Sequence, residues 1–181
     1  PGPTDFARAL IPDCWVIFGQ RLLPYTLGHH IVILRSCPEV FTRACTLTQL
    51  LLAIRICSWP FNPDDPMKAL RASFLWHLRC AVIRVAVMRR PEVFLDRAAM
   101  LSEYLTNAMH VPKYWRVAPE GSGGSGTPME VCLLSSITAS GVSLRDALRL
   151  PLSAAWWLLL AHSERSGVIQ VDDEEEIVTH A

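Results

Sequence analysis

Residues 151–167 read PLSAAWWLLLAHSERSG, a stretch that contains a complete helix with a start and a stop signal. Proline suits the first turn of a helix, because its ring fixes φ near the helical value and its missing N–H would have no partner there. Gly167 stands where a left-handed C-terminal cap is expected. The residues between them predict an apolar α-helix that carries Trp156 and Trp157 side by side.

The same helical spacing recurs along the chain. Thr46 and Gln49 have the form of a capping box, in which each side chain satisfies the other's backbone amide, so a buried helix is predicted from about 47 to 58. Helical patterns also cover residues 25–35, 67–88, 92–110, 128–140 and 143–150. We therefore predict an all-α protein, a compact bundle of about six to seven helices with short proline-rich turns and one short strand near 168–171.

Prolines and a Gly/Ser tract separate these helices. Three prolines between residues 60 and 66 exclude a helix interior there, and Asp64 and Asp65 are expected to cap the helix that follows. Pro91 after two arginines predicts another helix end. The GSGGSG tract at 121–126 predicts a flexible coil without chemistry, whether it is native or replaces another loop. We expect one helical domain over residues 1–171 and an acidic tail over 172–181.

Composition limits the class of protein. Hydrophobic residues make up 51% of the 181 residues, which excludes wholesale disorder. The 17 basic side chains balance the 17 acidic ones, but five of the acids lie in 172–176, so the rest of the chain is basic. The longest wholly apolar run, 154–161, is far shorter than the roughly 20 residues of a membrane span, and no secretory signal is visible. We expect a cytoplasmic protein without membrane contact, whose six scattered cysteines are mainly buried, reduced thiols.

Residues that could perform chemistry are few. The sequence has no phosphate-binding loop, dinucleotide fingerprint or nucleophile elbow, so we predict no catalytic residue and no enzyme activity. His29 and His30 are adjacent, and neighbours on a helix point about 100 degrees apart, so both cannot easily bind one metal. We expect one of them to face the core and the other the solvent. No metal site and no cofactor are predicted.

Binding to another protein is the function that the sequence favours. Consecutive indoles cannot both enter one narrow interior stripe, so at least one tryptophan is expected near the surface. The predicted partner-binding residues are Trp156, Trp157, Leu160, Asp172, Asp173 and Glu174, and association with a second copy remains open. The alternative is a nucleic-acid-binding domain that uses the basic region 68–116, although its arginines are spread around the helices rather than along one stripe.

Three stretches carry a resemblance to a known family: residues 22–34 (LLPYTLGHHIVIL), residues 51–61 (LLAIRICSWPF), and 151–167 together with the acids beyond it. They resemble segments of phage and prophage tail assembly chaperones. The resemblance implies a non-catalytic assembly factor whose partner is a tape-measure or tail-tube type subunit. A partner helix of that kind would be held in an apolar groove. The Gly/Ser tract departs from the pattern of this family.

Overall fold

The structure is a computed structural model that describes residues 14–42, 44–71, 73–109, 114–116, 128–167 and 169–171. Within these ranges it contains seven α-helices and two sheets of two strands each, which confirms the predicted all-α class. None of the described helices combines the length and the apolar composition that crossing a lipid bilayer requires.

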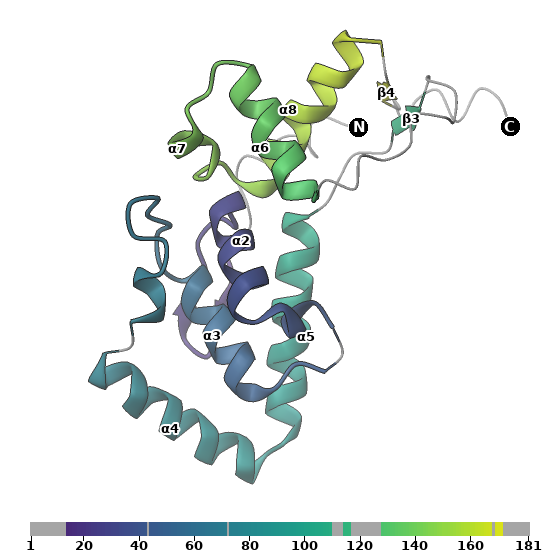
Figure 1. Ribbon diagram of the computed structural model, residues 1–181. Helices are drawn as coiled ribbons and strands as arrows, with labels where there is room; N and C mark the ends of the chain where they lie inside the picture. The colour runs from purple at the N-terminus through teal and green to yellow at the C-terminus, as the bar shows by residue number, and fades with distance from the viewer. Residues whose placement is uncertain are drawn as a thin grey trace, which may run out of the picture.

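The helices form three groups along the molecule (Figure 1). The middle group consists of α2 (Leu27–Ser36), α3 (Leu47–Cys57) and α5 (Glu92–Ala108), with the short 3-10 helices η1 (Pro38–Phe41) and η2 (Lys68–Leu70) beside them. At one end lie α6 (Met129–Ala139), α7 (Leu144–Ala147) and α8 (Leu152–Arg165), and at the other end lies α4 (Phe74–Arg89).

The main core forms where α2, α3 and α5 meet. Its buried side chains include Leu27, Ile33, Leu50, Ile54, Leu101 and Leu105. The capping box of α3 is confirmed, because Thr46 Oγ1 accepts a bond from the Gln49 amide and Gln49 Oε1 accepts one from the Thr46 amide at 2.8 Å. In α2, Val32 and Ile33 are buried, whereas Leu34 is exposed.

The N-terminus of α2 lies against the segment that joins α7 to α8, although the two are far apart in the sequence. The amides of Leu27 and Gly28 donate to the carbonyls of Leu150 and Leu148, at 3.1 and 2.9 Å, and the Leu152 amide donates back to the Tyr25 carbonyl at 2.8 Å. The first amides of a helix have no partner within the helix. The segment between α7 and α8 therefore caps α2 and fixes the end group of helices to the middle group.

Short antiparallel strands complete the fold. Strands β1 (Val16–Ile17) and β2 (Gln20–Arg21) form a hairpin whose two turn residues, Phe18 and Gly19, both have positive φ, as a type I′ turn requires. The strand expected near 168–171 is confirmed as β4 (Ile169–Val171), which pairs with β3 (Tyr114–Arg116). The sequence indicated neither the hairpin nor β3, because each strand is only two or three residues long.

Most helix ends agree with the sequence, but two expectations were wrong. The helix predicted over 67–88 begins only at Phe74, after Ser73 as N-cap, because residues 68–70 form η2 instead. Asp64 and Asp65 do not cap η2. They pair with arginines instead, Asp64 with Arg145 and Asp65 with Arg71 at 3.2 Å.

Helix α8 ends where the sequence predicts, but it begins one residue later. Pro151 is its N-cap residue, one position earlier than predicted, and Leu152 is its first helical residue. Gly167, which follows the C-cap Ser166, adopts a φ of 72° and thus the left-handed conformation expected there. The Gly/Ser tract at 121–126 and the acidic tail at 172–181 lie outside the described residues.

Candidate protein-binding surface

Helix α4 exposes an apolar face along its whole length. Six of its side chains are between 43% and 80% exposed: Phe74, Leu75, Leu78, Val82, Val85 and Met88. We call these six residues the α4 outer face. Single exposed apolar residues are common on proteins, but a contiguous apolar patch marks an interaction surface.

The spacing of the α4 outer face is regular. Leu75, Leu78, Val82 and Val85 follow one another at intervals of three, four and three residues. This is the spacing of the a and d positions in a heptad, which places the four side chains in one row along the helix. Phe74 and Met88 flank the row on one side. The face is therefore a stripe that runs along the helix axis.

The opposite side of α4 holds the helix to the rest of the protein. Ile83 is buried, and Trp76, Cys80 and Val87 are half-buried. Arg79 donates a hydrogen bond of 2.6 Å to the carbonyl of Phe18 in the β1–β2 hairpin. Arg84 donates a longer one, of 3.4 Å, to the hydroxyl of Thr48 on α3. Helix α4 thus carries apolar side chains on both faces, and the protein covers one of them.

Arg55 on α3 contacts both the segment around η2 and the start of α4. Its side chain is 9% exposed, and its guanidinium donates to the carbonyls of Ala69 and Arg71, the second at 2.7 Å. The guanidinium carbon also lies 4.8 Å from the centre of the Trp76 ring, within the range of a cation–π interaction. One arginine therefore links α3, the segment around η2 and the first turn of α4. It positions the start of the α4 outer face.

The arginines are the charged residues of α4, which contains no acid. Residues 74–91 contain Arg79, Arg84, Arg89 and Arg90 and no acidic residue. Arg84, Arg89 and Arg90 are exposed, whereas Arg79 is half-buried against the hairpin. Acids reappear at Glu92 and Asp96, on α5. The stripe is therefore apolar with a basic border.

Three of the residues that the sequence proposed for partner binding, Trp156, Trp157 and Leu160, lie on α8, at the other end of the molecule. Trp156 is half-buried and packs against the main core, and Trp157 is half-buried as well. Leu160 is 4% exposed, so its side chain belongs to the interior. Leu158, at 47% exposure, is the large apolar side chain that α8 presents to solvent. Asp172, Asp173 and Glu174 lie outside the described residues.

The histidine pair differs from its prediction, because both side chains are buried, at 2% and 4% exposure. His29 accepts from the Thr26 amide at Nδ1, 3.2 Å away, and therefore donates from Nε2 to the Trp59 carbonyl, 2.8 Å away. His30 lies between Tyr25 and Glu130, at 3.0 Å from the phenol oxygen and 3.2 Å from the carboxylate. Burial lowers the pKa of both histidines, so they are neutral and structural.

The cysteines also differ in part from their prediction. Cys37 and Cys57 are buried and all six thiols are free of disulfides, as expected, but Cys14 is exposed and Cys45, Cys80 and Cys132 are half-buried. Burial raises the pKa of the Cys37 thiol to about 12 and raises that of Cys57 as well. The buried thiols therefore act as small apolar groups of the core.

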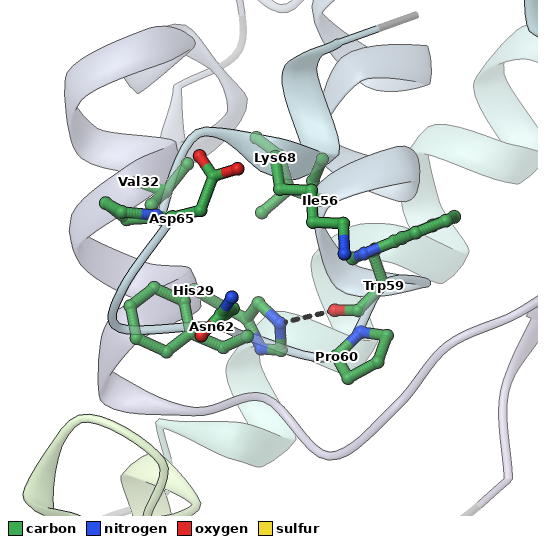
Figure 2. Close-up of a pocket in the computed structure, with 11 residues that line it drawn as sticks. His29, Val32, Ile56, Trp59, Pro60, Asn62, Asp65 and Lys68 are labelled. Atoms are coloured by element: carbon green, nitrogen blue, oxygen red, sulfur yellow. Dashed lines mark hydrogen bonds between the residues drawn. The ribbon is translucent and has the colours of Figure 1, made fainter. Parts of the chain in front are cut away.

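A shallow hollow lies beside His29, under the proline-rich turn that follows α3. Figure 2 shows it between the side chains of His29, Trp59, Asn62, Asp65 and Lys68. Its volume is about 220 Å³ even with the open solvent at its mouth included, so the enclosed part is well below the roughly 300–1,000 Å³ of a ligand site. His29 already uses both ring nitrogens in hydrogen bonds. Among the residues that the structure describes, no three His, Cys, Asp or Glu side chains are grouped so that they could hold a metal ion.

Comparisons of the chain with protein-family models, with curated proteins and with solved structures each found no match. Among the described residues, the α4 outer face gathers six of the fourteen exposed large apolar side chains. Sequence reasoning placed a helix there but did not recognise its outer face as a surface. The signal that could have revealed this surface is that α4 carries apolar residues on both faces. A single neighbouring element can cover only one face of a helix, so the other stays exposed.

Proposed function

We propose that this chain is a non-catalytic protein-binding factor of the phage tail assembly chaperone type, which holds a helical segment of a tape-measure or tail-tube type subunit. The α4 outer face is the observation that supports this proposal. A helix that is apolar all round is normally buried on both sides. Here one side lies open to solvent, and a partner polypeptide would cover it.

The exposed area is large enough to contribute to binding. Full burial of one aliphatic or aromatic side chain contributes about 1.5–3 kcal/mol. Six side chains that are roughly half to four-fifths exposed would therefore supply on the order of 6–10 kcal/mol in total. Association itself costs about 4–15 kcal/mol. The α4 outer face alone thus fits a reversible complex, which suits a factor that must release its client during assembly.

A second surface on α8 is part of the same proposal. The half-buried Trp156 and Trp157, beside the exposed Leu158, present aromatic area close to the solvent. Tryptophan is enriched among residues that dominate binding energy. Helices α4 and α8 lie at opposite ends of the molecule (Figure 1), so a long helical client could contact both ends in turn.

The test is capture of purified tape-measure type and tail-tube type subunits by the immobilised full chain. We expect Val82→Asp to reduce capture at least about ten-fold, because a buried, unpaired charge costs several kcal/mol. Val131→Asp is the matched control, since Val131 is 50% exposed on α6 and Val82 is 62% exposed on α4. We expect Trp157→Ala to weaken capture without loss of helicity.

Two results would contradict the proposal. One is equal capture by wild type, Val82→Asp and Trp157→Ala, which would exclude both surfaces. The other is strong retention on heparin or DNA that falls steeply with added salt, because that response is typical of phosphate neutralisation. Two basic side chains of the 68–116 region are already engaged within the protein, since Arg71 pairs with Asp65 and Arg79 donates to the Phe18 carbonyl.

A further inference from the structure

The α4 outer face has the geometry of one half of a helix–helix seam. Leu75 and Val82 take the a positions of a heptad, and Leu78 and Val85 take the d positions. Phe74, Ala81 and Met88 then fall at g, and Ala81 is exposed and small enough to let a second helix approach closely. On a helix these positions share an arc of roughly 140 degrees.

The dimensions of the stripe select a helix rather than a strand as the occupant. Phe74 and Met88 are 14 positions apart in α4, so the stripe is about 21 Å long. Its a and d side chains recur at an average of about 5 Å along the axis. A strand presents side chains to one face about every 6.6 Å. Its side chains would therefore lose alignment with the a and d side chains of α4 within two or three residues. A second helix with the same heptad spacing stays in register.

The charges select the composition of that helix. Arg89 occupies the a position that follows Val85, whereas Arg84 occupies a c position, one turn before Met88, and also reaches the Thr48 hydroxyl on α3. Both side chains are exposed, and α4 itself holds no acidic residue. Carboxylates at the facing flank positions would lie opposite these guanidinium groups. Complementary potentials of this kind raise association rates and fix the register of a complex.

The same charges argue against a second copy of the chain as the occupant. Two α4 helices packed in parallel through their outer faces would bring Arg89 of one copy close to Arg89 of the other. Neither helix carries an acid to offset them. Like charges set against each other across an interface weaken association.

We propose that the occupant of the α4 outer face is an acidic amphipathic helix of another polypeptide, with apolar residues at heptad a and d positions and carboxylates along its flanks. This inference rests on the proposed function, because it names the class of segment that the protein-binding surface takes. It commits to the charge of the partner, which the proposed function leaves open. It also commits to a length of at least two heptads.

The test uses synthetic helical peptides of three heptads, with leucine at a and d, and with glutamate, glutamine or lysine at e and g. Binding of each labelled peptide to the full chain is measured by fluorescence anisotropy at low and high salt. We expect the glutamate peptide to bind about ten-fold or more tightly than the lysine peptide at low salt, and the ratio to shrink as salt screens the charges. The double substitution Arg84→Glu and Arg89→Glu should invert that preference.

Control variants separate the surface from its charge. Val82→Asp should abolish binding of the glutamate peptide, and Val131→Asp on α6 should leave it unchanged. If Val82→Asp lowers helicity or the melting temperature, Leu78→Asp replaces it, with Leu144→Asp as its control, because these leucines are 54% and 56% exposed. Loss of binding in the α4 variants alone supports the proposal.

Each of the following outcomes would overturn a specific part of the two proposals. Equal affinity for the three peptides would overturn the proposal that the partner helix is acidic and leave the protein-binding function in place. Binding that persists in Val82→Asp and Leu78→Asp would remove the α4 outer face from both proposals. A dimer in sedimentation of the protein alone, dispersed by Val82→Asp, would assign the face to a second copy and overturn the inference.

Discussion

The guanidinium carbon of Arg55 lies 4.8 Å from the centre of the Trp76 ring. Arg55 belongs to the buried helix α3 and Trp76 to the first turn of α4, so this contact joins the core to the helix that carries the proposed binding surface. The same guanidinium donates to the Ala69 and Arg71 carbonyls. A single side chain therefore fixes where α4 leaves the body of the protein.

Replacing Arg55 with leucine should destabilise the protein by about 2–4 kcal/mol, because two carbonyls lose a charged donor and Trp76 loses its cation. Urea unfolding followed by circular dichroism gives the free energy of unfolding. Arg149, which is exposed on the loop after α7, provides a comparison as Arg149→Leu, with an expected change below about 0.5 kcal/mol. A loss for Arg55→Leu no larger than that of the control would show that the contact contributes little.

Stability should fall when the pH drops below 6.5, the ordinary pKa of histidine. Burial lowers the pKa of His29 and His30 in the folded state, so between the folded and unfolded pKa values the unfolded chain binds more protons. Protonation therefore favours unfolding, and the loss begins as the pH falls through 6.5. Above that pH both states are neutral at these positions and the effect vanishes.

Urea unfolding at a series of pH values from 8 to 5 would measure this slope. His30→Gln should flatten it, because that side chain keeps polar contacts to Tyr25 and Glu130 without titrating in this range. Equal slopes in wild type and His30→Gln would mean that His30 is not the group responsible.

Thiol reactivity should follow burial. Cys14 is exposed and should react with a disulfide reagent in the folded protein, whereas Cys37 and Cys57 should react only after unfolding. The pKa of Cys37 is raised to about 12 by burial, so almost none of its thiol is ionised at neutral pH. A spectroscopic thiol titration, with and without denaturant, measures both groups.

Cys14→Ser identifies the fast phase of that titration. We expect the variant to lose it and to keep the slow phases. A fast phase that survives in Cys14→Ser would show that one of the half-buried cysteines, or a core cysteine, is accessible in solution.

Gly28→Ala should destabilise the protein by about 1–3 kcal/mol, because a methyl group there would meet the ring of Phe61. Gly28 lies in the first turn of α2, where the turn after α3 packs against the helix. The melting temperature and the urea midpoint measure the loss. The double variant with Phe61→Leu should recover part of it, since the smaller side chain leaves room. Additive losses in the double variant would exclude this contact as the cause.

Helix existence and helix ends were readable from the sequence at most positions. The capping box of α3, the stop before Pro91, the short helix after Ser143 and the left-handed Gly167 were all predicted, and all are present. These signals are local, because a cap or a stop depends on residues within about four positions of one another. The hairpin around Phe18 left no such signal, since it lacks the usual asparagine and its strands have two residues each.

The sequence by itself determined that the chain forms a succession of capped helices, because local hydrogen bonding and backbone preference decide that much. Only the tertiary structure decided which face of each helix is covered. Both His29 and His30 are buried because groups as distant as Trp59 and Glu130 contact them. Val82 and Leu78 are exposed because Arg79 and Ile83 face the body of the protein on the other side of α4. Burial depends on contacts with residues far away in the sequence. The local spacing of apolar residues is the same for a covered face and for an exposed one, so it does not distinguish them.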